Sequence, residues 1–415
     1  MRYNLSHLLL PILGAILFVA CEDDIYDIPG GNIPRGGLPV VEIVTHEHET
    51  IDRDFLRNTQ LTITDSQGGQ DYSGICMIKG RGNTTWESYP KKPYQITFES
   101  NIGLLSYPPG ETWVLLANYK DQTLMRNDLA MFLSSKMGHI DYTPRGCFVN
   151  FILNGQYRGI YQIVEHLEVD KQRIDVGEDG FLLEIDGKAH YDDVTFRINH
   201  INQPISIKYP EVMENDADYN YVKDFLLKAE EALFSDHFTD ENTGYRHYID
   251  MDSFVEWYLV NEISKNNDAA FYTSCFMHLK RNGKLQMGPI WDYDWAFGGY
   301  KKDKQGRTVA NIPENFYIKY VEWYQRLFED PLFVEKVKSR FNDYYSNRQQ
   351  IYDHIDENYR LLVNYVVYDN MIWERVCDRD NSEEKVKAAY LKRTNNLKEW
   401  IEKRMQWMKA NIDEL

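Results

Sequence analysis

Short apolar runs separated by turn-forming residues dominate the first half of the chain. Three of them, at 39–44, 61–64 and 74–78, predict a small antiparallel β-unit, with Gly68-Gly69 as one of its turns. In 93–98, Tyr94, Ile96 and Phe98 alternate with polar residues, which predicts a strand with these three side chains facing inward. Further apolar runs predict strands at 113–117, 147–153, 157–164 and 181–186.

Two Asn-Gly pairs mark predicted hairpins. Asn154-Gly155 separates the apolar runs 147–153 and 157–164, and Asn282-Gly283 separates 271–279 from 284–290. Asn-Gly favours the tight turn in which both central residues take positive φ. We therefore expect each pair of runs to form adjacent antiparallel strands.

Helical periodicity becomes dominant after about residue 216. Asp121 is expected to cap a helix at about 122–137, and Asp250 or Asp252 a helix that reaches Lys265. Asp330-Pro331 has the cap and first-turn proline that favour another helix start. The pattern as a whole predicts an α+β protein with a β-rich part at 38–190 and a mainly helical part at 191–415.

The N-terminus has the pattern of an exported lipoprotein. The apolar run 8–20 follows Arg2 and ends in Ala20-Cys21, which predicts a signal peptide at 1–20 and acylation of Cys21. The alternatives are an uncleaved anchor or a buried apolar strand. The acidic residues 22–24 resemble an export signal of some Gram-negative surface lipoproteins, and 21–37 is predicted to be a tether. We expect an outer-membrane or cell-surface location with a lipid anchor.

Charge and cysteine content limit the function classes. The 415 residues carry a formal net charge of -18, which argues against nucleic-acid binding through a general basic surface. An anionic phosphate substrate would need a local cluster of Arg and Lys. The four cysteines beyond Cys21 lie in apolar surroundings without C-x-x-C spacing, so buried free thiols are expected rather than disulfides.

The stretch 288–299 carries the strongest candidate chemistry. If 290–295 is extended, Trp291, Tyr293 and Trp295 share one face, and Asp292 and Asp294 share the other. Neighbouring carboxylates repel each other unless a cation or proton lies between them. Mg2+ prefers oxygen ligands and binds one or two carboxylates together with phosphates. The alternative is an aromatic strand whose two aspartates face water.

The elements around this stretch follow an order known from phosphoryl-transfer enzymes. A predicted helix runs into the polar turn 266–268, a hairpin follows, and the chain then reaches Asp292. Protein kinases use the same order, with a catalytic-loop Asp before the hairpin and a metal-binding Asp after it.

Several separated motifs resemble the CotH family of atypical kinases, which are related to the spore coat protein H. These motifs are 79–86, 91–94, 115–127 and 288–299, and the resemblance extends from about residue 38 to 345. It implies an atypical protein-kinase-like fold that binds ATP with Mg2+ and phosphorylates protein.

By this resemblance, the two acidic sites have separate roles. Asp268 would accept or orient the proton of the acceptor hydroxyl, and Asp292 would hold Mg2+ with support from Asp294. Ordinary kinases carry an Asn for a second metal five residues after the catalytic Asp, and this chain has Thr273 there. The number of metal ions therefore stays open.

Four residues are candidates for nucleotide binding. Arg81, Lys92 and Arg126 would share the phosphate charge, and Glu165 would hold the phosphate-binding lysine. Lys91 is the rival of Lys92, and a surface lysine pair is the plain alternative. Arg126 stands at a predicted helix start, where a cation is unfavourable, which indicates an anionic partner, either carboxylate or phosphate. The strand 181–186 would carry the adenine edge.

Two functions from different classes remain open. The first is transfer of phosphate from ATP to a protein hydroxyl, with Mg2+ as cofactor and an unidentified protein as acceptor. The second is a degenerate kinase fold that acts as a surface binding or scaffold protein, because a cell surface has no obvious supply of ATP. No nucleic-acid partner is expected for either.

Overall fold

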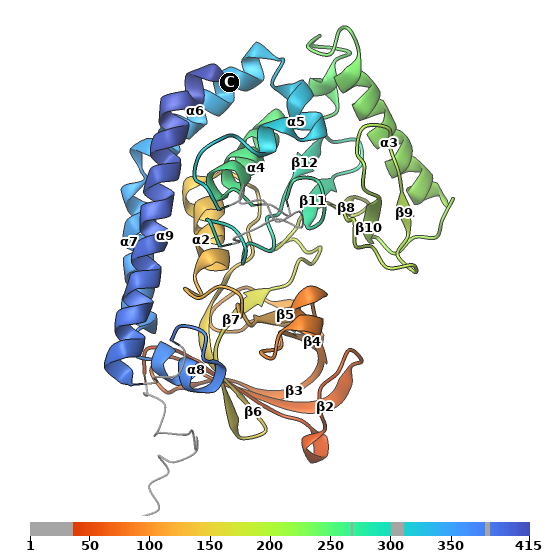
Figure 1. Ribbon diagram of the computed structural model, residues 1–415. Helices are drawn as coiled ribbons and strands as arrows, with labels where there is room; N and C mark the ends of the chain where they lie inside the picture. Colours follow the sequence, from red (N-terminus) through yellow and green to blue (C-terminus); the bar gives the residue numbers. More distant parts are fainter. Residues whose placement is uncertain (1–35, 267–268, 300–310, 378–381) are drawn as a thin grey trace, which may run out of the picture.

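The computed structural model describes residues 36–266, 269–299, 311–377 and 382–415 (Figure 1). A β-rich part occupies the N-terminal half, and helices surround a second sheet in the remainder, as the apolar patterns predict. None of the helices in these described ranges is long and apolar enough to cross a lipid bilayer.

The N-terminal part is a closed barrel of seven strands, and the small antiparallel β-unit predicted at 39–78 forms its first three. Its strands are β1 (Val40–Val44), β2 (Leu56–Thr64), β3 (Gln70–Gly80), β4 (Tyr94–Ile102), β5 (Gly110–Leu116), β6 (Gly146–Leu153) and β7 (Gln156–Glu165). They follow the order β1-β2-β3-β4-β5-β7-β6, and β1 closes the barrel by pairing with β6 in parallel. Closure leaves no unpaired strand edge.

The interior of the barrel is filled by the inward faces of its strands. Tyr94, Ile96 and Phe98 of β4 are buried, as their alternation predicts, and they pack with Phe151 and Tyr161 of the β6–β7 hairpin. Asn154 and Gly155 both have positive φ at the turn of that hairpin, which confirms the expected tight turn.

Helix α2 (Arg126–Phe132) lies between the barrel and the helical part, and a π-helical turn (Leu133–Met137) continues it. The helix begins four residues later than the pattern predicts, because 118–124 forms hydrogen-bonded turns. The N-cap residue is Met125 and not Asp121, although the Asp121 carboxylate accepts hydrogen bonds from the N–H groups of Thr123 and Arg126. A short helix, α1 (Thr84–Ser88), follows β3.

A second sheet of five strands forms the centre of the other part. Its strands are β8 (Phe181–Ile185), β9 (Thr195–Phe196), β10 (Ile205–Tyr209), β11 (Cys275–Leu279) and β12 (Leu285–Met287), in the order β12-β11-β8-β10-β9. Helix α3 (Ala217–Phe234) flanks β9 and β10, and α4 (Met251–Ser264) packs on β12. Because β8 and β9 share this sheet, the structural division lies in the linker 166–180 rather than at residue 190.

The C-terminal helices are α5 (Glu322–Leu327), α6 (Pro331–Ser346), α7 (Gln349–Leu362), α8 (Val366–Trp373) and α9 (Glu383–Asn411). Asp330 caps α6, as predicted, and α6, α7 and α9 run side by side along one edge of the molecule (Figure 1). Short 3₁₀ turns occur at 46–48, 245–247, 318–320 and 412–414. The four described cysteines are free thiols, two of them fully buried.

Helix α8 packs against both strand β7 of the barrel and helix α9 (Figure 1). Its Asp369 is fully buried and pairs with the ammonium of Lys91 at 2.7 Å and the guanidinium of Arg375 at 2.6 Å. The same carboxylate accepts the N–H of Ile160 in β7 at 2.9 Å. This ion cluster fastens the C-terminal region to the barrel.

Candidate active site

A cleft of about 880 Å³ lies between the barrel and the second sheet. The barrel contributes the loop after β3, which carries Arg81, and the linker contributes 166–170. From the other side come the end of β8 and the segment after β12, with Asp292 and Asp294. The two aspartates predicted to hold a metal are therefore both in the cleft, opposite Arg81.

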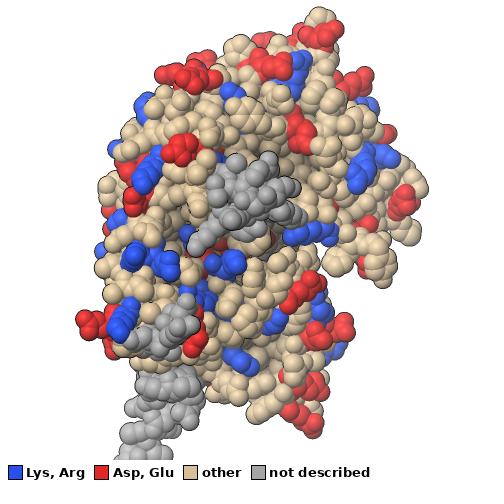
Figure 2. Space-filling model, viewed as in Figure 1, with Lys and Arg blue, Asp and Glu red and all other residues tan. Residues whose placement is uncertain are grey.

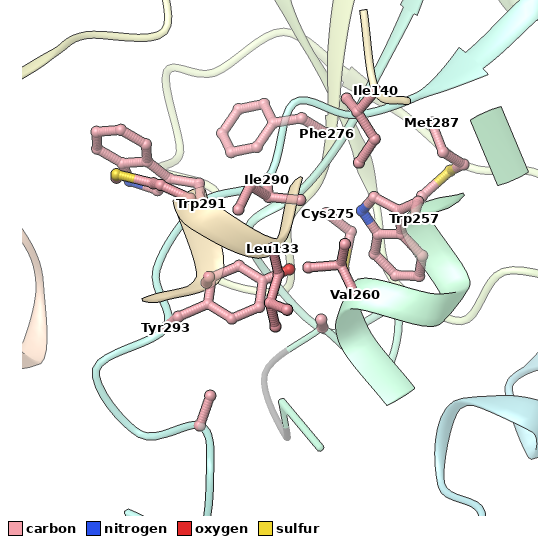
Figure 3. Packing of buried hydrophobic residues seen from close by; sticks show 14 of the residues in the cluster. Leu133, Ile140, Trp257, Val260, Cys275, Phe276, Met287, Ile290, Trp291 and Tyr293 are labelled. Atoms are coloured by element: carbon pink, nitrogen blue, oxygen red, sulfur yellow. The ribbon is translucent and has the colours of Figure 1, made fainter. Parts of the chain in front are cut away.

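The segment that carries these aspartates is not the strand that its alternation indicates. Sheet pairing ends at Met287, and Asp292 has a φ of 66°, which no β-strand accommodates. The alternation of faces holds only for the first three residues: Trp291 and Tyr293 are buried and Asp292 is exposed to the cleft, whereas Asp294 and Trp295 are both half-buried and both line the cleft. In Figure 3, Ile290, Trp291 and Tyr293 pack among side chains from α4, β11 and the π-helical turn.

The charge of Asp292 is controlled by both walls of the cleft. Solvent reaches the side chain, yet the protein around the cleft raises its pKa by burial, while the charges of Arg81 and Lys188 act to lower it. The guanidinium of Arg81 lies over the ring of Trp291, 5.4 Å from its centroid. Arg81 is thus placed next to the carboxylate that would bind a metal.

A neutral histidine completes this corner of the cleft. The His166 ring meets Trp291 edge-on, with ring centroids 6.3 Å apart. Burial, followed by the charges of Arg81, Arg173 and Lys79, lowers the pKa of His166 to about 3. His166 was not among the residues predicted for the site, because a lone histidine after a strand has no recognisable spacing to other candidate residues.

The ammonium groups of the two lysines proposed for phosphate binding do not point into the cleft. The ammonium of Lys92 donates to the carbonyl oxygen of Trp86, and Lys92 does not line the cleft. Lys91 borders the cleft, but its side chain is fully buried in the ion cluster with Asp369. Burial lowers the pKa of Lys91, and Asp369 opposes this. Neither ammonium can reach a phosphate without moving.

Arg126 and Glu165 also lie outside the cleft. The Nε of Arg126 donates to the carbonyl oxygen of Ala296 at 2.9 Å, and its guanidinium pairs with Asp121. The anionic partner indicated by its position is thus a carboxylate. Glu165 is occupied by Arg145, with contacts of 2.7 and 2.8 Å, and by the hydroxyl of Tyr142 at 3.0 Å. Glu165 therefore does not hold Lys92, because Arg145 is its partner.

Asp268 and Cys21 lie outside the described residues. The chain just before Asp268 is held firmly: α4 ends at Ser264, capped at its start by Asp250 as expected, and Lys265 has a φ of 49°. The Lys265 ammonium donates to the carbonyl oxygens of Ile312 and Glu314 at 3.0 and 2.6 Å.

A second acidic group lines the far wall of the cleft. Lys208 of β10 lies 3.3 Å from Glu184, 3.6 Å from Asp186 and 3.6 Å from Asp193. Burial raises the pKa of Glu184 to about 7, although Lys208 acts in the opposite direction. The sequence predicted the strand that carries Glu184 and Asp186, and their spacing of two is the signal that both face one side.

Among the described residues, acidic side chains outnumber basic ones around the cleft. The basic ones are Arg81, Lys91, Lys188 and Lys208, and the acidic ones are Glu111, Glu168, Asp170, Glu184, Asp186, Asp193, Asp292 and Asp294. No group of three or more His, Cys, Asp or Glu in these ranges is arranged to hold a metal ion by itself. A metal at Asp292 and Asp294 would need further ligands from water or from a bound phosphate.

The sequence pattern of a family described as CotH kinase protein matches residues 78–408. The chain belongs to this family, as its motifs indicate. The matched region begins in β3 and ends in α9, so it includes both walls of the cleft.

A particular relative is the inner spore coat protein H of Bacillus subtilis (strain 168), which is 23% identical to this chain over 225 residues. That similarity covers 54% of this chain and 58% of the Bacillus protein.

Proposed function

We propose that this protein is an ATP-dependent kinase that requires Mg2+ and phosphorylates a hydroxyl group of another protein. The observation that supports it best is the arrangement of Arg81 and the Asp292–Asp294 pair on opposite walls of one cleft. Phosphoryl transfer depends on positioning and on neutralising phosphate charge, and this pair of walls offers a cation and metal-binding carboxylates. Membership of the CotH kinase family gives independent support.

The charge of the cleft accounts for a metal requirement. Eight carboxylates and four basic groups border it, so a nucleotide triphosphate without bound cations would be repelled. Mg2+ binds one or two carboxylates and completes its shell with phosphate oxygens and water. Asp292 and Asp294 would hold it, and when bound it would neutralise the phosphates.

The remaining roles follow from the family resemblance and from chain order. Asp268 would orient the acceptor hydroxyl, since the helix before it and the hairpin after it have the order expected around a catalytic loop. Arg81 and, across the cleft, Lys188 take the place of Lys92 as phosphate contacts in this proposal, because their charges reach Asp292. The lipid anchor at Cys21 would keep the enzyme at the cell surface.

Binding of ATP to the purified protein, measured by titration calorimetry with and without millimolar Mg2+, tests this function. We expect Mg2+-dependent binding that the Asp292→Asn variant weakens by roughly tenfold or more, since groups that merely support a metal ligand already contribute about that much. Asp252→Asn is a matched control, because Asp252 is an exposed aspartate that pairs with Lys336 on α6. Equal effects of the two substitutions would contradict the proposal.

A second candidate is a surface binding or scaffold protein without catalysis. It is favoured by the positions of Lys92, Arg126 and Glu165, whose charged groups all have partners outside the cleft. If the wild-type protein binds no ATP at millimolar Mg2+, this candidate replaces the kinase.

A further inference from the structure

Asn127 makes a contact that the proposed chemistry has not yet used. It lies in the motif 115–127, on the first turn of α2, and is 5% exposed. Its amide oxygen accepts the backbone N–H of Tyr293 at 2.6 Å. Its amide nitrogen donates to the side-chain oxygen of Asn118 at 2.9 Å.

The peptide that Asn127 contacts is the one that joins Asp292 to Tyr293. The carbonyl oxygen of the same peptide, which belongs to Asp292, accepts a hydrogen bond from the side-chain amide of Asn266 at 3.4 Å. Asn127 comes from α2 and Asn266 from the turn after α4. Both ends of one peptide dipole are therefore held by asparagines from different elements.

This peptide determines where the Asp292 carboxylate points. Asp292 has a φ of 66°, a conformation that costs free energy for a residue with a Cβ and persists only where its surroundings impose it. Rotation of the peptide would release the N–H of Tyr293 inside the protein without a partner, because Tyr293 is buried. The two asparagines thus supply the surroundings that keep Asp292 in place.

Only an amide side chain suits the position of Asn127. The residue must accept from Tyr293 and donate to Asn118, whose own amide nitrogen donates to the carbonyl oxygen of Leu124 at 3.2 Å. A carboxylate would lose the donor, and an apolar residue would lose both bonds. The neighbouring Arg126 donates to the carbonyl oxygen of Ala296, so α2 holds the same segment at a second place.

We infer that Asn127 and Asn266 are positioning residues that clamp the Asp292–Tyr293 peptide and so orient the metal-binding carboxylate. The metal-binding role of Asp292 in this inference rests on the proposed function. The clamp of the peptide itself can be tested without any ligand.

The first measurement is hydrogen–deuterium exchange of the segment 288–299 in the protein without metal or nucleotide. Asn127→Ala should make the Tyr293 amide exchange at least about tenfold faster, because its acceptor is removed. Asn370→Ala is the matched control: Asn370 on α8 is also buried and accepts backbone N–H groups, those of Val376 and Cys377. Unchanged exchange at Tyr293 in Asn127→Ala would overturn the inference.

The second measurement is the affinity for Mn2+, a paramagnetic probe that binds oxygen ligands as Mg2+ does. We expect Asn127→Ala and Asn266→Ala each to raise the dissociation constant about 10- to 100-fold, as loss of a group that orients a metal ligand does. Asn370→Ala should change it less than about twofold. An equal change in all three variants would show a general loss of structure and contradict the inference. If Asn127→Ala fails to fold, Asn127→Ser and Asn266→Ala give the same comparison.

The two proposals fail in different ways. A wild-type protein that binds neither Mn2+ nor Mg-ATP would refute the proposed function, and the exchange measurement would still decide the clamp. Normal metal binding in wild type with unchanged affinity in Asn127→Ala would refute only the clamp's positioning role.

Discussion

Replacement of Asp369 by Asn should destabilise the protein strongly, although the site is far from the cleft's aspartates in sequence. The Asp369 carboxylate has no exposed surface and accepts from the ammonium of Lys91, the N–H of Ile160 and the guanidinium of Arg375. An Asn has nearly the same shape but removes the single negative charge from two buried cations. In the wild-type cluster one carboxylate compensates one of two cations, and in the variant both cations would be uncompensated.

The expected loss follows from the burial of these charges. Breaking a buried ion pair by removing one partner typically costs about 3–5 kcal/mol, because the remaining charge stays uncompensated. That is a large share of the roughly 5–15 kcal/mol by which most domains are stable. Lys91→Met should cost less, because it leaves Asp369 paired with Arg375 at 2.6 Å.

Urea denaturation followed by tryptophan fluorescence measures the free energy of unfolding of both variants and of their combination. In the Lys91→Met background, Asp369→Asn should cost less than it does alone, since fewer cations are then left without a partner. The contribution of Asp369 should also appear in the loss of stability at acid pH. Burial acts to raise the pKa of Asp369, but Lys91 and Arg375 together outweigh it and hold the pKa below its usual value. The contribution of Asp369 to stability is therefore present near neutral pH and lost as pH falls through the folded pKa. The Asn variant should lack this part of the acid loss.

A loss below about 1 kcal/mol for Asp369→Asn would refute this reasoning, because it would mean that Lys91 and Arg375 are solvated or neutral in the folded protein. Strict additivity of the two substitutions would refute the coupling between Lys91 and Asp369.

Three further predictions concern the cleft and the anchor. Asp292→Asn should weaken Mg-dependent ATP binding by roughly tenfold or more and remove transfer. Asp268→Asn should keep binding within a few-fold and reduce transfer by roughly two to four orders of magnitude, and equal loss of binding in both variants would contradict this division. Burial raises the pKa of Glu184 to about 7, so stability from its protonated form is present below its usual pKa and lost as pH rises toward 7. In urea titrations, the free energy of unfolding of Glu184→Gln should therefore fall less between pH 5 and pH 8 than that of wild type. An equal fall in both proteins would contradict the raised pKa of Glu184. Cys21→Ser should abolish acylation and membrane retention, and a lipid-modified Ser variant in mass spectrometry would refute the anchor.

Local patterns predict the elements of the fold well, because their causes are local. Alternation places Tyr94 and Phe98 inside the barrel, and Asn154-Gly155 forms the hairpin turn that its sequence favours. Closure of the barrel depends instead on parallel pairing of β1 with β6, between residues about a hundred positions apart. No periodicity within either strand contains that information.

In the candidate site, too, local sequence patterns do not contain the contacts that depend on residues far away in the chain. The spacing of Asp292 and Asp294 predicts that both face one side, and the cleft has both. Lys91 and Lys92 cannot be distinguished by sequence, since what buries Lys91 is Asp369, 278 residues further along the chain. Asn127 belongs to the motif 115–127, but its role cannot be read from the sequence, because the group that it holds in the segment after β12 is a backbone N–H.

The surface adds little that composition had not indicated. Figure 2 shows acidic side chains spread over both parts, with several Lys and Arg side chains on the visible face between them. This arrangement fits the formal net charge of -18 and gives no continuous basic surface on that face.

The attachment of α8 to the barrel has a consequence for how the cleft changes shape. The chain crosses between the two parts in the linker 166–180, and it returns through α8, where Trp373 donates to the carbonyl oxygen of Arg158 at 2.9 Å and Asp369 binds Ile160. Hinge closure rotates two bodies about a few residues that absorb the change in backbone angles. The contact of α8 with the barrel is charged and buried, so it opposes rotation of the barrel relative to the helical part, and a ligand would enter the cleft mainly through movement of individual segments at its rim.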